Sequence, residues 1–183
     1  MGKYILGALV ALFPYSLFLG MYCLYTPSIM ETVFFSNGFL LIGAVLLCAV
    51  VAFLLSCILV ILAIVKKYDA LAMARLNMII KLCQIPAYVV IFVLGFFFFI
   101  SVFGIGFTIV FVVFDCAAIV MSGMVGAVSA FRAYAEKRLI KSEGIVFGLL
   151  QFIFVADVVA CILLYVHLKK GKKQEIAAAE RPV

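Results

Sequence analysis

The chain has 183 residues and a formal net charge of +6, and 69% of its residues are hydrophobic while only 12% are charged. With a mean hydropathy of +1.40, this composition excludes a soluble globular protein, because too few polar residues remain to cover a water-facing surface. We therefore expect an integral membrane protein with one transmembrane domain, residues 1–168, followed by a basic and then polar C-terminal tail, residues 169–183.

Five apolar stretches are each long enough to cross a membrane, since a spanning helix needs about 20 apolar residues. The predicted spans are residues 4–25, 39–65, 82–103, 107–130 and 145–168. Lipid offers no hydrogen bonds to the backbone, and the stretches lack the polar alternation of a barrel strand. The predicted fold class is therefore all-α, a polytopic transmembrane helix bundle with five spans.

Glycine and proline punctuate these stretches. Residues 82–130 as one helix would be about 70 Å long, more than twice the ~30 Å hydrocarbon layer, so the chain must fold back. Gly104 and Gly106 mark the predicted turn, because glycine accepts the backbone angles of a tight hairpin. Pro14 is predicted to kink the first helix, and Pro86 to lie in the opening turn of the third.

Lysine and arginine at the span ends predict the orientation. With the N-terminus inside, five spans place Lys3 and the basic residues of segments 66–81 and 132–141 in the cytoplasm. The four lysines of segment 169–173 then emerge outside, which conflicts with the same rule. Either one apolar stretch fails to span or the whole molecule inverts. A signal peptide in place of the first span is disfavoured, because no A-x-A-like cleavage site follows it.

The residues that most catalytic and metal sites require are scarce. Six cysteines are scattered without C-x-x-C spacing, His167 is the single histidine, and no nucleotide, dinucleotide or zinc-hydrolase motif occurs. We expect no catalytic residues, no metal and no cofactor, and hence no enzyme. The basic residues flank the spans, so they indicate lipid headgroups as partners and not nucleic acid.

Asp115 and Asp157 each lie inside an apolar stretch, where a charged residue costs about 2.5–3.5 kcal/mol on insertion scales. Measured from the inner ends of their predicted spans, they lie about 22 and 18 Å deep, so antiparallel neighbours would bring them to one level. Ser122, Gly126 and Ser129 follow Asp115 on one helix face and predict a helix-packing stripe. Two interpretations remain open: protonated struts between two helices, or a shared proton or cation site.

Three segments carry a resemblance to a known family. Residues 76–88 (LNMIIKLCQIPAY), residues 114–116 (FDC) and residues 150–157 (LQFIFVAD) resemble an uncharacterised family of small bacterial multi-span integral membrane proteins. The resemblance implies a location in the cytoplasmic membrane and carries no known activity.

Two functions are consistent with these observations. The first is a non-catalytic accessory or interaction subunit of a membrane assembly, whose partners are the lipid bilayer and other membrane proteins or further copies of the chain. The alternative is a small proton- or cation-coupled transporter that uses Asp115 and Asp157. Purification with identification of co-purifying proteins would discriminate between them.

Overall fold

The structure is a computed structural model that describes residues 2–101 and 104–179, with side chains described as far as residue 174. All regular structure in these residues is helical, and no strand occurs among them. Eight helices are described, with these bounds: α1 (Gly2–Leu12), α2 (Tyr15–Tyr25), α3 (Pro27–Thr32), α4 (Gly38–Val65), α5 (Ala70–Ile100), α6 (Ile105–Ala135), α7 (Lys141–Leu150) and α8 (Ala156–Ala179). The predicted all-α fold is confirmed.

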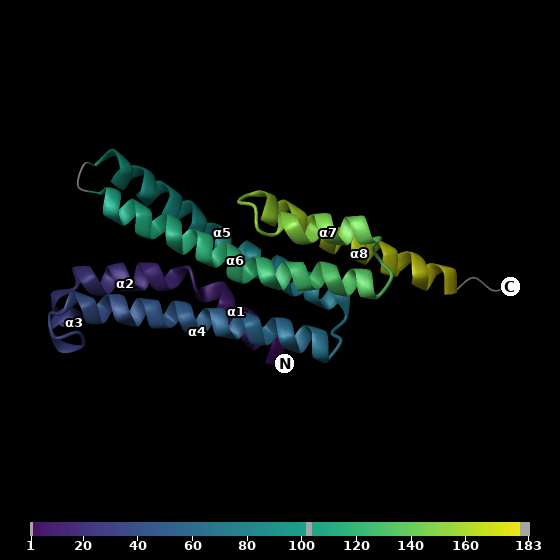
Figure 1. The fold of residues 1–183 in the computed structure, drawn as a ribbon, viewed down its shortest axis with the longest axis horizontal. Coiled ribbons are helices and arrows are strands. Elements are labelled where there is room, and N and C mark those ends of the chain that lie inside the picture. Colours follow the sequence, from purple (N-terminus) through teal and green to yellow (C-terminus); the bar gives the residue numbers. More distant parts are fainter. Residues whose placement is uncertain (1, 102–103, 180–183) are drawn as a thin grey trace.

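Three of these helices, α4, α5 and α6, are long and apolar enough to cross a membrane. The pair α1 and α2, bent by 49° at a short break, makes a fourth candidate span. The structure thus supports a membrane-embedded bundle of three to four spans, and the predicted count of five is not confirmed. The helices lie roughly side by side along the long axis of the molecule (Figure 1).

The bend between α1 and α2 lies at Pro14, as predicted. Proline has no N–H, so it cannot donate to the carbonyl four residues earlier, which is that of Val10. Two donors replace it: the backbone N–H of Phe13 and the side-chain amide Nε2 of Gln84, each 3.3 Å from Val10 O. A carbonyl freed by proline in a membrane helix must find such a partner.

Helix α5 begins at Ala70, well before the predicted start of the third span at residue 82. Asp69 caps it by accepting a hydrogen bond from Ala72 N at 3.0 Å. Pro86 therefore lies inside the helix and not in its opening turn. Lys81, which the sequence placed in a cytoplasmic loop, therefore lies within α5, where it is fully buried.

The connection between α5 and α6 lies where the sequence predicted a fold-back, but Gly106 lies inside α6 and not in the turn. Gly104 directly precedes α6, and its N–H donates to Ser101 O at 2.8 Å. A Cβ at this position would lie 2.2 Å from the carbonyl oxygen of Phe98, so the turn requires glycine there. Residues 102 and 103 lie outside the described residues.

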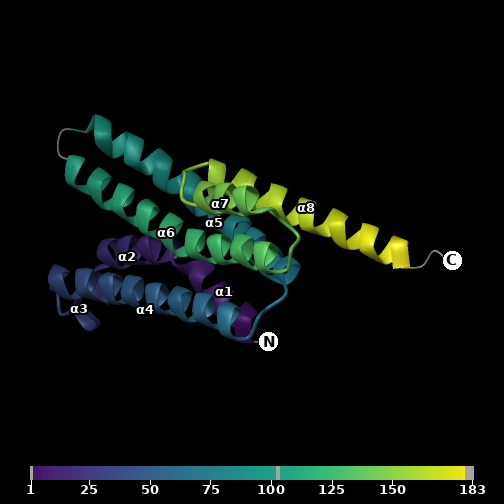
Figure 2. The same ribbon diagram turned by 45° about the vertical axis from the view of Figure 1, so that its right-hand side comes forward.

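The predicted fifth span does not form one helix. Helix α7 ends at Leu150 and α8 begins at Ala156, and the chain reverses direction between them. Val155 adopts a left-handed φ of 66°, which is unfavourable for a β-branched residue. Figures 1 and 2 show α7 and α8 side by side, with their connection beside the middle of α5 and α6. We call residues 141–179 the α7–α8 hairpin.

The hairpin brings the end of α8 back to the end of the bundle from which α7 started (Figure 2). We call this end of the bundle the basic end, because basic side chains make contacts there. Lys3 Nζ lies 4.9 Å from the ring centroid of Tyr68, and Arg132 Nε donates to Tyr68 O at 2.9 Å. Arg138 Nη2 lies 3.8 Å from Asp69 Oδ1. The lysines of segment 169–173 extend from the same end, which removes the conflict in the predicted topology.

Candidate functional site

Polar side chains form a stripe along one face of α5, in the middle of the bundle. Asn77, Lys81, Gln84 and Tyr88 follow one another at helical spacings of four, three and four residues, which places them on a single face. All four are buried. The stripe faces the tip of the α7–α8 hairpin and the bend at Pro14, and we call these residues with Gln151 and Asp157 the polar cluster.

An ion pair lies at the centre of the polar cluster. Lys81 Nζ donates to Asp157 Oδ2, and the two side chains are 0% and 2% exposed. The second carboxylate oxygen, Oδ1, accepts a hydrogen bond from Val158 N at 2.8 Å, so Asp157 also satisfies one of the free N–H groups in the first turn of α8. Burying either charge alone would be costly, whereas each here has its opposite charge in direct contact. The pair therefore attaches the start of α8 to α5.

A second contact attaches the end of α7. Asn77 Nδ2 donates to Gln151 Oε1 at 3.0 Å, and both side chains are fully buried. The remaining polar atoms of this amide pair, Asn77 Oδ1 and Gln151 Nε2, have no hydrogen-bond partner among the described residues. Buried polar atoms are nearly always paired. Asn77 Oδ1 can therefore still accept a hydrogen bond, and Gln151 Nε2 can still donate one, to a water molecule or a small polar ligand.

The third part of the cluster reaches the N-terminal helices. Tyr88 OH donates to Gln84 Oε1 at 2.9 Å, and the Gln84 amide nitrogen donates to Val10 O. The same face of α5 thus contacts the break in α1–α2 and both arms of the hairpin. Two discontinuities in the helical backbone, the α1–α2 break and the turn of the hairpin, thus meet around one polar stripe, and burial in protein is what allows irregular backbone at membrane depth.

The structure does not bring Asp115 and Asp157 together. Asp157 contacts Lys81, whereas Asp115 faces a cavity lined by Ile91 and Gly95 of α5. Ile91 lies ten residues beyond Lys81, about 15 Å along the helix. The predicted common level assumed that residues 145–168 form one continuous helix, and the reversal at residues 151–155 moves Asp157 toward the basic end. The proposed role of either acid in proton or cation binding stays a prediction.

Asp115 is half-buried on α6, and its Oδ1 atom is buried without a hydrogen-bond partner among the described residues. The cavity beside it has a volume of about 220 Å³ and is otherwise lined mostly by aromatic and aliphatic side chains of α5 and α6. Phe92 lines both this cavity and a larger one of about 410 Å³ at the hairpin tip, where Asp157 lies. Asp115 therefore lies just beyond the part of α5–α6 that the hairpin covers.

The predicted packing residues on α6 lie against the rest of the bundle. Ser122 and Ser129 are fully buried, and their hydroxyls donate to Ala118 O and Gly126 O, each at 2.7 Å. A Cβ on Gly126 would lie 2.3 Å from Gln151 Oε1, so this glycine permits the close approach of the hairpin. Gly126 thus faces the residue that follows α7, whereas the two serine hydroxyls bond within α6.

Sequence reasoning missed Lys81 and Asn77 as members of the site. The available signal was the spacing of residues 77, 81, 84 and 88, which becomes visible only if α5 starts before residue 77. On one continuous helix over residues 145–168, Gln151 and Asp157 would lie on well-separated faces. Because the chain reverses between them, both contact α5.

Among the described residues, no group of three or more His, Cys, Asp or Glu side chains is arranged to hold a metal ion. Comparison with protein-family models, curated proteins and solved structures finds no match for this chain. The resemblance to a bacterial membrane family stays a prediction.

Proposed function

We propose that this chain is a non-catalytic interaction subunit of a membrane assembly, located in the cytoplasmic membrane. A transmembrane helix of the partner protein docks against α5 and α6 beyond the hairpin tip and places a basic side chain beside Asp115. The observation that carries the proposal is the unpartnered carboxyl oxygen of Asp115 in an apolar setting.

Lipid explains the need for a partner at this position. A carboxyl group in the hydrocarbon region is costly unless another group pairs with it, and acyl chains donate no hydrogen bonds. None of the described basic residues forms an ion pair with Asp115: Lys81 is paired with Asp157, and no basic side chain lines the cavity beside Asp115. A positively charged donor from a second protein supplies the complementary charge.

The exposed surface next to Asp115 fits a docking helix. Phe92, Phe96 and Val112 surround the cavity and are exposed on the same side. Figures 1 and 2 show α5 and α6 extending past the hairpin, so α7 and α8 do not cover the half of α5 and α6 that contains Asp115. Helices associate in lipid through packing and polar contacts, and this surface offers both.

Reconstituted vesicles test the proposal with a defined probe. A synthetic transmembrane peptide of leucine and alanine with one lysine in its apolar segment is compared with the same peptide carrying leucine instead. Association is measured by energy transfer from a donor attached at residue 141. We expect the lysine peptide to associate more strongly, and Asp115→Asn to remove this preference.

Asp69→Asn is the matched control, because it removes a carboxylate at the basic end and leaves the proposed contact intact. Equal association of both peptides, or a lysine preference that survives Asp115→Asn, would contradict the proposed contact. Energy transfer between two copies of the chain that depends on Asp115 would also overturn it, because the occupant would then be a second copy and not a different protein.

A second candidate function, proton- or cation-coupled transport, is favoured by the Lys81–Asp157 pair. Ionisable pairs at membrane depth are typical of ion and proton pathways, and discontinuous helices are typical of transporter binding sites. The unpartnered amide atoms of Asn77 and Gln151 add polar capacity beside the pair. This function requires that Asp157→Asn abolish proton uptake by reconstituted vesicles while the protein still assembles.

A further inference from the structure

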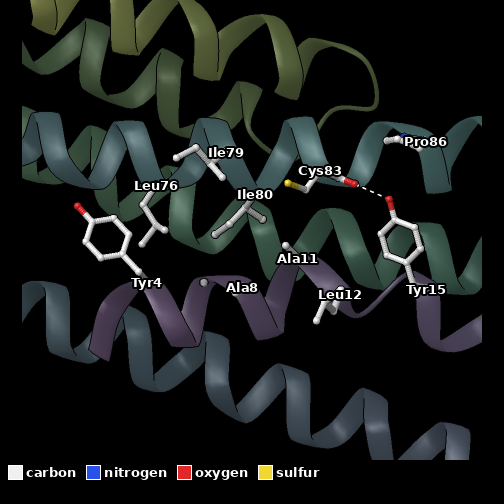
Figure 3. Close-up of a pocket in the computed structure, with 11 residues that line it drawn as sticks. Tyr4, Ala8, Ala11, Leu12, Tyr15, Leu76, Ile79, Ile80, Cys83 and Pro86 are labelled. Carbon is white, nitrogen blue, oxygen red and sulfur yellow. Dashed lines mark hydrogen bonds between the residues drawn. The ribbon is translucent and has the colours of Figure 1, made fainter. Parts of the chain in front are cut away.

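A groove between α1 and α5 opens to the surface on the side of α5 away from the polar cluster. Its volume is about 610 Å³, and its lining is almost wholly apolar (Figure 3). Small residues of α1 form one wall, and side chains of α5 form the other: Gly7, Ala8 and Ala11 face Ile79, Cys83 and Pro86.

The groove exists because α1 approaches α5 closely at one point and bends away at another. A Cβ on Gly7 would lie 2.7 Å from Leu76 Cδ1, so α1 and α5 are in contact there. Farther along, the break at Pro14 redirects the chain, and Tyr15 OH donates to Cys83 O at 2.7 Å (Figure 3). Tyr4 and Tyr15 therefore mark the two ends of the groove.

The length of the groove matches one leaflet of a bilayer. Along α5, which is continuous here, the lining runs from Leu76 to Pro86, a length of ten residues or about 15 Å. Half of the hydrocarbon layer is about 15 Å thick. An acyl chain lying in the groove would therefore extend from the headgroup region at the basic end to the middle of the membrane, where Tyr15 and Pro86 lie.

The mouth of the groove carries positive charge. Arg75 is exposed and lies four residues before Ile79, on the helix face that lines the groove. Lys3 immediately precedes Tyr4, and its Nζ lies 5.4 Å from the centroid of that ring. No Asp or Glu is among the residues that line the groove. The charge at the mouth thus complements an anionic headgroup.

We propose that this groove binds an anionic phospholipid of the leaflet at the basic end, with one acyl chain between α1 and α5 and the headgroup phosphate beside Arg75 and Lys3. Basic side chains near the membrane surface attract anionic lipids, and the groove adds contact with an acyl chain. The site is separate from Asp115 and from the polar cluster, so it holds whether or not the proposed function is correct.

Cys83 provides a direct readout, because its side chain is exposed and lines the groove. A variant that keeps Cys83 and Cys48 is purified in mild detergent and alkylated with a maleimide during titration with phospholipid. Cys48, exposed on α4, is the internal control. We expect phosphatidylglycerol to slow alkylation of Cys83 and not of Cys48, at lower concentrations than phosphatidylcholine.

Two variants identify the headgroup contact. Arg75→Gln should raise the phosphatidylglycerol concentration for half-protection about fivefold, the factor expected for one basic side chain near anionic lipid. Lys141→Gln removes another exposed charge at the same end, away from the groove, and should have no effect. Equal protection by both lipids, or equal effects of the two variants, would overturn the proposal.

Filling the groove tests the acyl-chain contact separately. Ala8 is exposed and lines the groove, so Ala8→Phe occupies the space of the lipid without disturbing the core. We expect the purified variant to retain less phosphatidylglycerol than the unaltered protein in native mass spectrometry. Unchanged retention would show that lipid binds to the protein elsewhere.

Discussion

At the residue scale, the fold depends on a buried ion pair, and removing one of its two charges leaves the other buried without a partner. Lys81 and Asp157 are both buried, and each offsets the desolvation cost of the other. Asp157 was recognisable from the sequence as an acid inside an apolar stretch. Lys81 was not, because Lys and Arg next to apolar stretches usually lie in loops, and only the true start of α5 shows that this lysine is inside a helix.

A double-mutant cycle on Lys81 and Asp157 tests whether the two side chains interact. Lys81→Met or Asp157→Leu alone should lower the free energy of unfolding by about 3–5 kcal/mol, because each leaves the other charge buried and unpaired. The double variant should lose much less than the sum. Unfolding in mixed detergent measures all three, with Lys141→Met as an exposed control. Additive losses would show that the two side chains do not pair.

At the element scale, the α7–α8 hairpin is the feature that sequence patterns predicted least well. Residues 145–168 have the length and apolarity of a span, and the turn at residues 151–155 has neither glycine nor proline to signal it. Two tertiary contacts with α5 stabilise the turn: Gln151 with Asn77, and Asp157 with Lys81. By contrast, Pro14 and Gly104 act locally, and their breaks were predictable from the sequence.

The close packing of the hairpin against α6 depends on Gly126. Gly126→Leu should lower stability by about 1–3 kcal/mol and displace Gln151, because its Cβ alone would overlap that side chain. Gly148→Leu is the matched control, since nothing lies within 4 Å of a Cβ there. Melting in detergent and alkylation of the buried Cys161 report the change. An unaltered melting temperature and a protected Cys161 would mean that α6 and the hairpin do not pack as described.

At the scale of the whole molecule, charge separates the two ends of the bundle. The basic end combines the start of α1, the α4–α5 and α6–α7 connections and the end of α8 (Figure 1). The opposite end, with α3 and the α5–α6 connection, carries Glu31 as its one charged side chain among the described residues. A bundle with all basic termini and connections on one side satisfies the positive-inside rule without exception. The sequence alone could not give this arrangement, because it requires the reversal in the hairpin.

The most direct test of this account is the side of the membrane on which α8 ends. In a cysteine-free background, single cysteines at Ser36, Lys137 and Lys172 are exposed to a membrane-impermeant thiol reagent on intact cells; all three positions are exposed in the structure. The hairpin predicts that Lys137→Cys and Lys172→Cys behave alike, and that Ser36→Cys behaves oppositely. With the basic end inside, only Ser36→Cys is labelled. Labelling at both Ser36→Cys and Lys172→Cys, with protection at Lys137→Cys, would show that residues 145–168 cross the membrane, and the hairpin would have to be abandoned.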